Sequence, residues 1–420
     1  MNITFRSAIV LDPRSKHHNK QVDISIKNGH IYQIGKINKP VGKEINANGM
    51  FVSLGWFDMS CLFGDPGYEY KEDRTSGCQT AASGGFTGVA LLPNTNPVIE
   101  NKNDIAYLKA LNKSHVTSIY PLAAVTKHAL GEDLTEMIDL HHAGAIAFTD
   151  GVNPVWNSDI LLKTLLYLQK FDGLLINRPE DKMLTQFATM NEGVQSTLSG
   201  MKGMPNISEE IMIARDLRIL EYTGGKIHFS NISTAEAVKL IKKAKQEGLK
   251  VTCDVAAHQL TLEEGLIDDF DTNLKVNPPL RTRKDINALI KGLEDDTIDA
   301  IVSAHRPQDE ESKKAEFDQA EFGQTGLQTV LPILIQLSNK LSLEKMIEKL
   351  TISPCKILGL EVPEIKKGAQ ANLTVFDPKA KWVLDEYTNH SKSVNSWYFG
   401  KELTGRVVAT VNGENTYILS

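Results

Sequence analysis

Short apolar runs alternate with longer amphipathic segments through the middle of the chain. Two of the amphipathic segments, residues 233–248 and 287–296, repeat apolar residues at the spacing of a helix. Strands that alternate with helices predict an α/β fold, and eight strands predict a closed (β/α)8 barrel of the TIM type. An open doubly wound sheet is the alternative, but the first strand is followed by neither a phosphate-binding loop nor a G-x-G-x-x-G motif. The eight predicted strands are residues 51–60, 86–92, 118–125, 145–149, 173–177, 226–231, 250–255 and 298–304.

Both ends of the chain carry alternating apolar and polar residues, which predict antiparallel strands. An Asn-Gly pair interrupts the alternation near each end, and this pair is a strong signal for a tight hairpin. The segments concerned are 2–12 (one strand), 21–35 (a hairpin at Asn28-Gly29), 371–378 (one strand) and 407–419 (a hairpin at Asn412-Gly413). We therefore predict two domains, a small β-sandwich formed by residues 1–52 with 362–420, and a barrel formed by residues 53–361.

The composition is that of a soluble globular protein. Of the 420 residues 41% are apolar and 23% are charged, and the net charge is −6. Lysines and arginines are dispersed, which argues against binding to nucleic acid. We find no apolar stretch long enough to span a membrane and no signal peptide, so we expect a cytoplasmic protein without membrane contact. The four cysteines form no C-x-x-C motif and are expected to be free thiols.

Polar residues at the carboxyl ends of the predicted strands are the candidates for chemistry, because active sites of such barrels lie at that face. They are Asp58-Met59-Ser60, Pro93-Asn94-Thr95, Thr149-Asp150, Asn177-Arg178, Ser230-Asn231 and Ser303-Ala304-His305.

Motifs along nearly the whole chain resemble those of type I dihydroorotases, members of the amidohydrolase superfamily. The segments that carry the resemblance are 55–59 (GWFDM), 65–73 (DPGYEYKED), 82–87 (ASGGFT), 92–97 (LPNTNP), 213–217 (IARDL) and 275–281 (KVNPPLR). The resemblance implies a zinc-dependent enzyme that interconverts dihydroorotate and N-carbamoyl-L-aspartate. A metal is needed there because bound water must lose its proton near neutral pH.

The metal ligands that the resemblance implies are replaced in this chain. Ser60 and Leu62 stand where the family has His-x-His, and Ala304 stands where it has the aspartate that is both ligand and general base. Alanine can neither bind a metal nor carry a proton. The other replaced positions are Gly151, Arg178 and Asn231, although a one-residue gap would put Asp150 in place of Gly151. We therefore expect no bound zinc, no other cofactor and no catalytic residue.

Other side chains near the strand ends allow more than one interpretation. We expect His228 to be packed or hydrogen-bonded, since it points away from Asn231. We interpret Arg178 as a cation that offsets carboxylates such as Asp58, Asp65 or Glu180, with simple exposure to solvent as the alternative. A dyad of Cys61 with His258 or His305 is conceivable, although Cys61 is expected to face the other way.

The substrate pocket implied by the resemblance is half retained. Asn94, Asn277 and the Phe322-Gly323 loop match, whereas Gly64 and Gln308 replace an arginine and a histidine that hold the substrate carboxylate. The two asparagines either satisfy loop backbone groups or outline a remaining anion pocket. Without the arginine we expect no tight binding of dihydroorotate.

Three functions remain open from the sequence. In the first, which we favour, the chain is an inactive structural partner of aspartate carbamoyltransferase, because degenerate dihydroorotase relatives serve that role. The second is an active cyclic amidohydrolase with altered metal binding, through Asp150 for example, and the third is a ligand-binding sensor. We also expect a homo-oligomer.

Overall fold

The computed structural model describes residues 2–110 and 115–419 and contains the predicted barrel. Eight parallel strands follow one another in sequence order around it. A parallel bridge between Cys61 and His305, with a 3.0 Å hydrogen bond from Leu62 N–H to the His305 carbonyl, joins the last strand end to the first. The sheet is therefore a closed barrel and not the open alternative. Its strands are β6 (Trp56–Cys61), β7 (Phe86–Leu91), β8 (Ser118–Ala123), β9 (Ala147–Phe148), β10 (Leu175–Asn177), β13 (Ile227–Phe229), β14 (Val251–Ala256) and β15 (Ala300–Val302).

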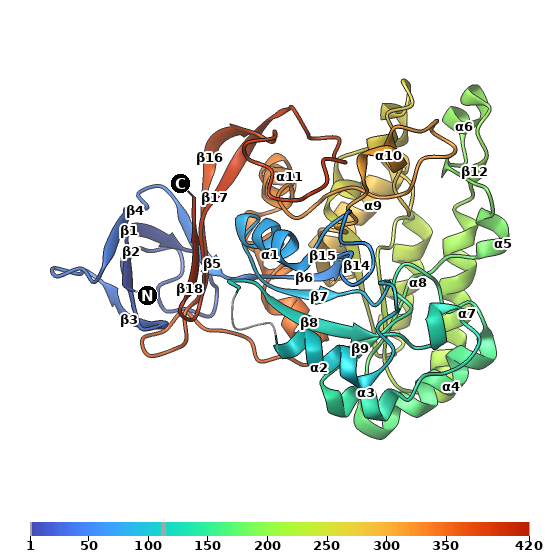
Figure 1. The fold of residues 1–420 in the computed structure, drawn as a ribbon, viewed down its shortest axis with the longest axis horizontal. Helices are drawn as coiled ribbons and strands as arrows, with labels where there is room; N and C mark the ends of the chain where they lie inside the picture. Colours follow the sequence, from blue (N-terminus) through green and yellow to red (C-terminus); the bar gives the residue numbers. More distant parts are fainter. Residues whose placement is uncertain (1, 111–114, 420) are drawn as a thin grey trace.

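Helices cover the outside of the barrel (Figure 1). Their apolar faces pack on the strands, as in α8, where Ala237, Val238, Ile241 and Ala244 are buried. The main helices are α1 (Arg74–Ser83), α2 (Lys102–Ala110), α3 (Met137–Ala143), α4 (Ser158–Leu168), α7 (Ile207–Thr223), α8 (Ala235–Gln246), α9 (Arg283–Glu294), α11 (Val330–Leu337), α12 (Leu343–Glu348) and α13 (Ile352–Ile357). Shorter elements in the loops are α5 (Lys182–Thr185), β11 (Met190–Asn191), α6 (Val194–Ser199), β12 (Gly203–Met204), α10 (Glu310–Lys313), and the 3-10 turns η2 (Lys127–Ala129), η3 (Gln169–Phe171), η4 (Ala257–Leu260), η5 (Glu264–Leu266) and η6 (Thr272–Leu274).

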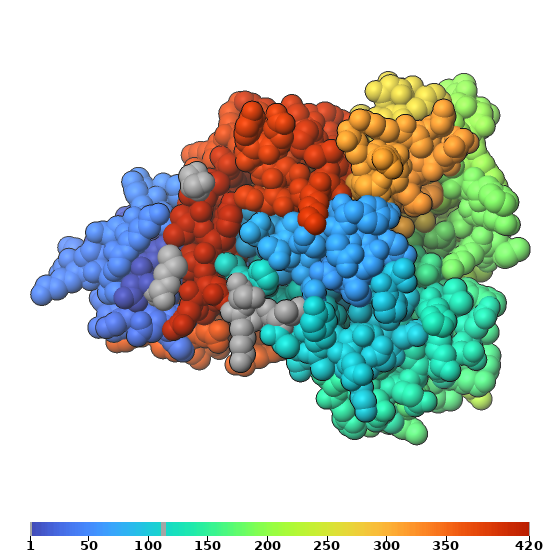
Figure 2. Space-filling model, viewed as in Figure 1, coloured from blue at the N-terminus to red at the C-terminus, as the bar shows by residue number. Residues whose placement is uncertain are grey.

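Strands from both termini share a second eight-stranded sheet beside the barrel. Its order is β18-β17-β16-β5-β1-β2-β3, and β4 pairs with β1. N-terminal residues (blue) and C-terminal residues (red) accordingly lie side by side on the surface (Figure 2). The strands are β1 (Asn2–Val10), β2 (Gln21–Lys27), β3 (His30–Gly35), β4 (Lys43–Asn46), β5 (Phe51–Leu54), β16 (Asn372–Val383), β17 (Glu402–Asn412) and β18 (Asn415–Ile418).

Two predicted elements differ in detail. The apolar run 51–60 is two strands, because β5 belongs to the terminal sheet and β6 begins the barrel after Gly55. A Cβ atom at Gly55 would lie 2.2 Å from Asn372 Oδ1, so the crossing point has no room for a side chain. The C-terminal hairpin turns at Gly413-Glu414, one residue later than predicted, since Asn412 pairs with Asn415. The Asn28-Gly29 turn is confirmed, with φ of 49° and 73°.

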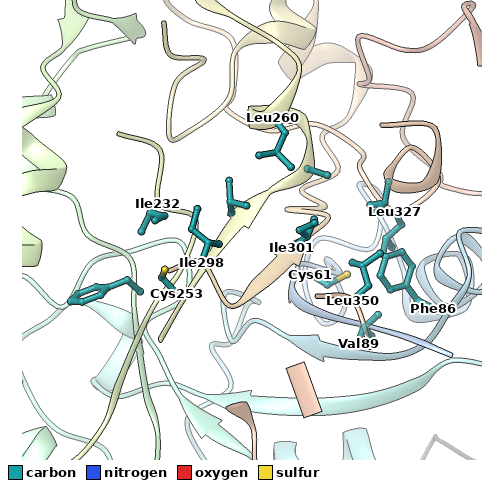
Figure 3. Close-up of a cluster of buried hydrophobic side chains, with 14 of the residues drawn as sticks. Cys61, Phe86, Val89, Ile232, Cys253, Leu260, Ile298, Ile301, Leu327 and Leu350 are labelled. Atoms are coloured by element: carbon teal, nitrogen blue, oxygen red, sulfur yellow. The ribbon is translucent and has the colours of Figure 1, made fainter. Parts of the chain in front are cut away.

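The hydrophobic core extends from the barrel strands to the covering helices. Side chains of β6, β7, β14 and β15 gather there with that of Leu350, which follows α12, as Cys61, Phe86, Cys253 and Ile301 illustrate (Figure 3). Trp56 connects the two sheets, because its ring lies 5.7 Å from both Phe86 and Phe376. Among the helices in the described ranges, none is long and apolar enough to cross a membrane.

Candidate functional site

A small cavity lies at the carboxyl ends of the barrel strands, where the sequence predicted the site. Its volume is about 40 Å³, enough for a few water molecules at most. The structure thus brings together five of the predicted ligand positions and Gly151. The residues that line the cavity are Ser60, Leu62, Leu92, Thr149, Gly151, Val152, Ile176, Arg178, Ser230, Asn231, Asn277, Ala304, His305 and Arg306.

Ser60 and Asn231 contact each other across this cavity. Asn231 Nδ2 donates to Ser60 Oγ at 3.1 Å, and the Asn231 backbone N–H donates to Asp254 Oδ1 at 2.6 Å. Leu62 is packed beside the apolar residues of the barrel interior. Within residues 2–110 and 115–419, no three His, Cys, Asp or Glu side chains are grouped so that they could hold a metal ion.

Arg178 is buried and forms an ion pair with Glu180. Its Nη2 lies 2.6 Å from Glu180 Oε2, and its Nη1 donates to the Val152 carbonyl at 2.6 Å. Burial acts to raise the pKa of Glu180, but the Arg178 charge and hydrogen bonds from Thr185 and Asn277 hold it below its usual value. The predicted role of Arg178 as a counter-charge is confirmed for Glu180, and the alternative of exposure to solvent is wrong.

The other two carboxylates have partners of their own. Asp65 pairs with Arg74 at 2.6 Å. Asp58 is fully buried and accepts hydrogen bonds from the Ser303 backbone N–H, at 2.9 Å, and from the Ser303 hydroxyl. Burial, with a smaller contribution from the charge of Asp254, raises the pKa of Asp58 to about 7. Arg178 is therefore the counter-charge of one predicted acid and not of all three.

Asp150 points away from the cavity. Its carboxylate accepts hydrogen bonds from the Thr126 backbone N–H at 2.9 Å and from the Thr126 hydroxyl at 2.6 Å, and burial raises its pKa to about 6. Gly151, which does line the cavity, has a φ of 66°, and a Cβ atom there would lie 1.8 Å from Asn94 Oδ1. In this conformation neither position directs a carboxylate into the cavity.

Replacing Gly151 with alanine is expected to destabilise the protein through this contact. A positive φ alone costs a non-glycine residue about 1–2 kcal/mol, and the clash with Asn94 adds to it. Gly200→Ala is the matched control, because Gly200 has a φ of 70° and nothing within 4 Å of a Cβ atom. Thermal unfolding should show a larger loss for Gly151→Ala than for Gly200→Ala. Equal losses of stability in the two variants would mean that the Asn94 side chain moves to accommodate the new methyl group without an energetic cost.

The retained asparagines have different roles. Asn94 accepts from the Val152 N–H at 2.9 Å and donates to the Asp150 carbonyl at 3.0 Å, which confirms that it satisfies loop backbone groups. Asn277 instead donates to Glu180 Oε2 at 3.2 Å and lines the cavity. The two asparagines therefore do not form one common binding surface.

A second cavity of about 190 Å³ adjoins the first and shares Leu62, Val152 and Arg306 with it. Gly64 and Gln308, at the positions where the resemblance implied residues that hold the substrate carboxylate, lie in its wall. Gln308 donates to the Phe322 carbonyl at 2.8 Å, and the Gly323 carbonyl accepts from Lys313 at 3.1 Å. The Phe322-Gly323 loop therefore supports the lining residue Gln308 through a hydrogen bond and is not itself part of the lining. The complete lining is Leu62, Gly64, Tyr68, Lys71, Asn94, Val152, Arg306, Pro307, Gln308 and Glu321.

The histidines and Cys61 do not form a catalytic dyad. His228 contacts Thr252 Oγ1 at 2.8 Å and Asp254 Oδ2 at 2.9 Å, so the prediction of a hydrogen-bonded histidine is confirmed. The Cys61 thiol lies in the hydrophobic core, where burial raises its pKa well above the ordinary value (Figure 3). Such a thiol is not an activated nucleophile. His305 lies 3.4 Å from Glu72, and burial lowers the pKa of His258 to about 3.

The sequence analysis did not identify Lys71 and Arg306, two cationic residues that line the second cavity, as candidate site residues. Lys71 Nζ donates to Gln308 Oε1 at 2.7 Å. The available signal was position, because Arg306 directly follows the predicted strand end Ser303-Ala304-His305. Only the fold reveals that Arg306 lines both cavities.

Comparison with known proteins gives full-length matches. Residues 50–237 match the family described as Dihydro-orotase-like, and residues 181–411 match the Amidohydrolase family. A protein named dihydroorotase from Acetivibrio thermocellus is 41% identical over 411 residues, with 96% of each chain covered. Another of that name, from Geobacter metallireducens, is 38% identical over 418 residues, with 98% of each covered.

Solved structures agree on the fold. The L-hydantoinase (dihydropyrimidinase) from Arthrobacter aurescens has a TM-score of 0.85 at 21% identity, covering 100% of this chain and 97% of that one. A D-hydantoinase has a TM-score of 0.83 at 19% identity, covering 100% and 95%. At these identities the likeness establishes the barrel with its added β-rich domain, and no more.

Proposed function

Because this chain belongs to the dihydroorotase family of amidohydrolases, we propose that it is a non-catalytic member that serves as a structural partner of aspartate carbamoyltransferase. The observation that carries the proposal is the set of side chains at the strand ends. Ser60, Leu62, Arg178, Asn231 and Ala304, at positions that the motif resemblance assigns to the family's metal ligands, line one cavity. We propose a cytoplasmic homo-oligomer without zinc.

The chemistry of these side chains does not suit zinc. Zinc takes cysteine, histidine and carboxylate ligands, whereas alanine and leucine have no donor atom and Arg178 brings a positive charge to the cavity. The Ser60 and Asn231 side chains are engaged with each other. Asp150, the acid that a one-residue gap would bring to a ligand position, is hydrogen-bonded to Thr126. These contacts support a cavity that is filled by protein groups rather than prepared for a cation.

The partnership rests on the family. Some dihydroorotases assemble with aspartate carbamoyltransferase, and degenerate relatives act there without turnover. An interface requires the folded surface but no metal, and the chain matches the Acetivibrio thermocellus relative over 96% of its length.

The proposal predicts no stoichiometric metal and no dihydroorotase turnover. We expect purified protein, supplied with zinc during expression and dialysed afterwards, to contain well below one zinc ion per chain by elemental analysis. The Acetivibrio thermocellus relative, prepared in parallel, is the control for metal retention and for the assay. Stoichiometric zinc together with turnover of dihydroorotate would overturn the proposal and favour an active enzyme with altered ligands.

The partner is tested separately. Tagged full-length chain co-expressed with the aspartate carbamoyltransferase of the same organism should co-purify with it and elute as one complex in size-exclusion chromatography. Separate elution of the two proteins would overturn the partnership, whatever the metal analysis gives.

A further inference from the structure

A third cavity lies beside the terminal sheet and is separate from the two at the barrel mouth. Its volume is about 830 Å³, and it shares no lining residue with either of them. Three segments contribute to it: the loop after β1 from Asp12 to His17, strand β3, and the segment from Glu364 to Lys367. Figure 1 shows β1 and β3 at the end of the molecule that the terminal sheet forms. We call this space the terminal cavity.

Hydrogen bonds hold two of these segments, from opposite ends of the chain, against each other. Arg14 Nη2 donates to the Pro363 carbonyl, and the Ser15 hydroxyl donates to the Ile365 carbonyl at 3.2 Å. The loop after β1 also closes on itself, because the Ser15 N–H donates to the Asp12 carbonyl at 2.9 Å. Ile365 is buried in the core of the terminal sheet. The cavity is therefore preorganised, which lowers the entropic cost of binding a ligand.

The lining of the terminal cavity carries more positive than negative charge. Its two acids already have partners, since one pairs with Arg14 and the other with Lys366. Among the residues that the structure describes, no acid pairs with the other two cations of the lining, Lys16 and Lys367. Burial, and after it the charges of two neighbouring lysines, lower the pKa of His17. The cavity therefore offers two unpaired positive charges in a chain whose net charge is −6.

Phosphate groups suit this charge pattern better than carboxylates do. A phosphate ester carries roughly 1.5 to 2 negative charges at neutral pH and three acceptor oxygens, whereas a carboxylate carries a single charge. A lysine ammonium binds phosphate as a point charge, and a guanidinium presents paired N–H donors to its oxygens. Four cations in one lining could thus share the oxygens of two or more phosphate groups.

The size and the third wall of the cavity favour an organic ligand. Its 830 Å³ lies within the range of roughly 300–1,000 Å³ usual for small-molecule sites, so an inorganic phosphate ion would occupy only a small part of it. Strand β3 contributes the half-buried side chains of Gln33 and Ile34. We propose that the terminal cavity binds a small organic molecule with two or more phosphate groups. Lys16 and Lys367 hold the phosphates, and Ile34 contacts the rest of the ligand.

This site goes beyond the function proposed above and does not depend on it. Every residue of its lining belongs to the terminal segments 12–34 and 364–367, and none was a candidate from the sequence. Binding of a phosphate ester there requires no metal at the strand ends, no turnover and no protein partner.

The test is a titration of the full-length chain by calorimetry at low, fixed ionic strength and without magnesium. The probes are ATP and fructose 1,6-bisphosphate, with adenosine and fructose as their uncharged counterparts, and tripolyphosphate and citrate as other anions. We expect at least one organic phosphate to bind and its uncharged counterpart not to bind. The double variant Lys16→Gln/Lys367→Gln should weaken this binding by more than about tenfold. Lys284→Gln/Lys379→Gln, at two exposed lysines outside the cavity, makes the same change in charge and should bind as the unaltered chain does.

Thermal unfolding separates a ligand contact from a structural role. Lys16 and Lys367 are exposed, so without ligand their double variant should unfold at the same temperature as the unaltered chain. The bound phosphate should raise the unfolding temperature of the unaltered chain and of the control, but not of the Lys16→Gln/Lys367→Gln variant.

Three results would overturn the proposal. The first is that neither organic phosphate binds, and the second is that the two double variants bind equally well. The third is that tripolyphosphate or citrate binds more tightly than both organic phosphates, which would contradict the assignment to a phosphate ester. None of these results bears on zinc content or on co-purification, so the two proposals fail independently.

Discussion

Replacing Arg281 with methionine is expected to lower the free energy of unfolding by about 3–5 kcal/mol, the usual loss when one partner of a buried charge network is removed. Arg281 is almost fully buried, and so is Glu209, whose carboxylate lies 3.9 Å from it. Glu209 also accepts from the backbone N–H groups of Ser233 and Thr234, both at 2.9 Å. The Arg281 guanidinium donates to Ser233 Oγ, Asn191 Oδ1, the Met204 carbonyl and Asn206 Oδ1. Methionine fills a similar volume but leaves these acceptors unpaired. The loop of residues 190–206 therefore loses the hydrogen bonds that connect it to Arg281.

Arg283→Met is the matched control for this prediction. Arg283 is about half exposed and pairs with Glu263 on the surface, and an exposed pair contributes only about 0–1 kcal/mol. Urea unfolding followed by tryptophan fluorescence should therefore separate the two variants clearly. A midpoint for Arg281→Met as high as that for Arg283→Met would show that the buried network does not hold the loop.

The barrel could be predicted because its strands are buried on both faces. Runs such as 86–92 and 145–149 are mostly apolar, and amphipathic segments separate the predicted strands, which is the pattern of repeated β-α units. The boundary at Gly55 was missed because the apolar pattern continues across it. Only the close approach of Asn372 and Thr87 requires a residue without a side chain there.

The sequence predicted where the candidate site lies but not which side chains contact each other in it. Motif comparison placed Ser60, Arg178 and Asn231 at strand ends, and the structure brings all three to one cavity. Their partners come from distant parts of the chain: the Asn231–Ser60 bond joins residues 171 positions apart. No local pattern encodes such a pairing. Arg306 was missed for the same reason, since its place in the lining of both cavities is a property of the fold.

The free energy of unfolding is expected to depend on pH through Asp58. Burial raises the pKa of this carboxyl from its ordinary value of 3.8 to about 7. Between these values the unfolded chain has lost the proton and the folded chain keeps it, so folding takes up a proton and stability falls as the pH rises. Below about pH 4 both states are protonated and the contribution is flat. From pH 5 to pH 8 the loss from this group is ~3 kcal/mol, at 1.36 kcal/mol for each pKa unit.

Asp58→Asn should remove this dependence, because asparagine has the same shape and stays neutral. Its oxygen can still accept from the Ser303 backbone N–H. The difference in stability between the variant and the unaltered chain should move in favour of the variant by ~3 kcal/mol from pH 5 to pH 8, as measured by urea unfolding at each pH. Other buried acids, such as Asp216, are present in both proteins. Their contributions to the pH dependence of stability therefore cancel in this difference. Asp268→Asn, at an exposed aspartate, should follow the unaltered chain at both pH values. A difference for Asp58→Asn that stays constant with pH would mean that the carboxyl is already ionised at pH 5, and a cation held close to Asp58 would have that effect.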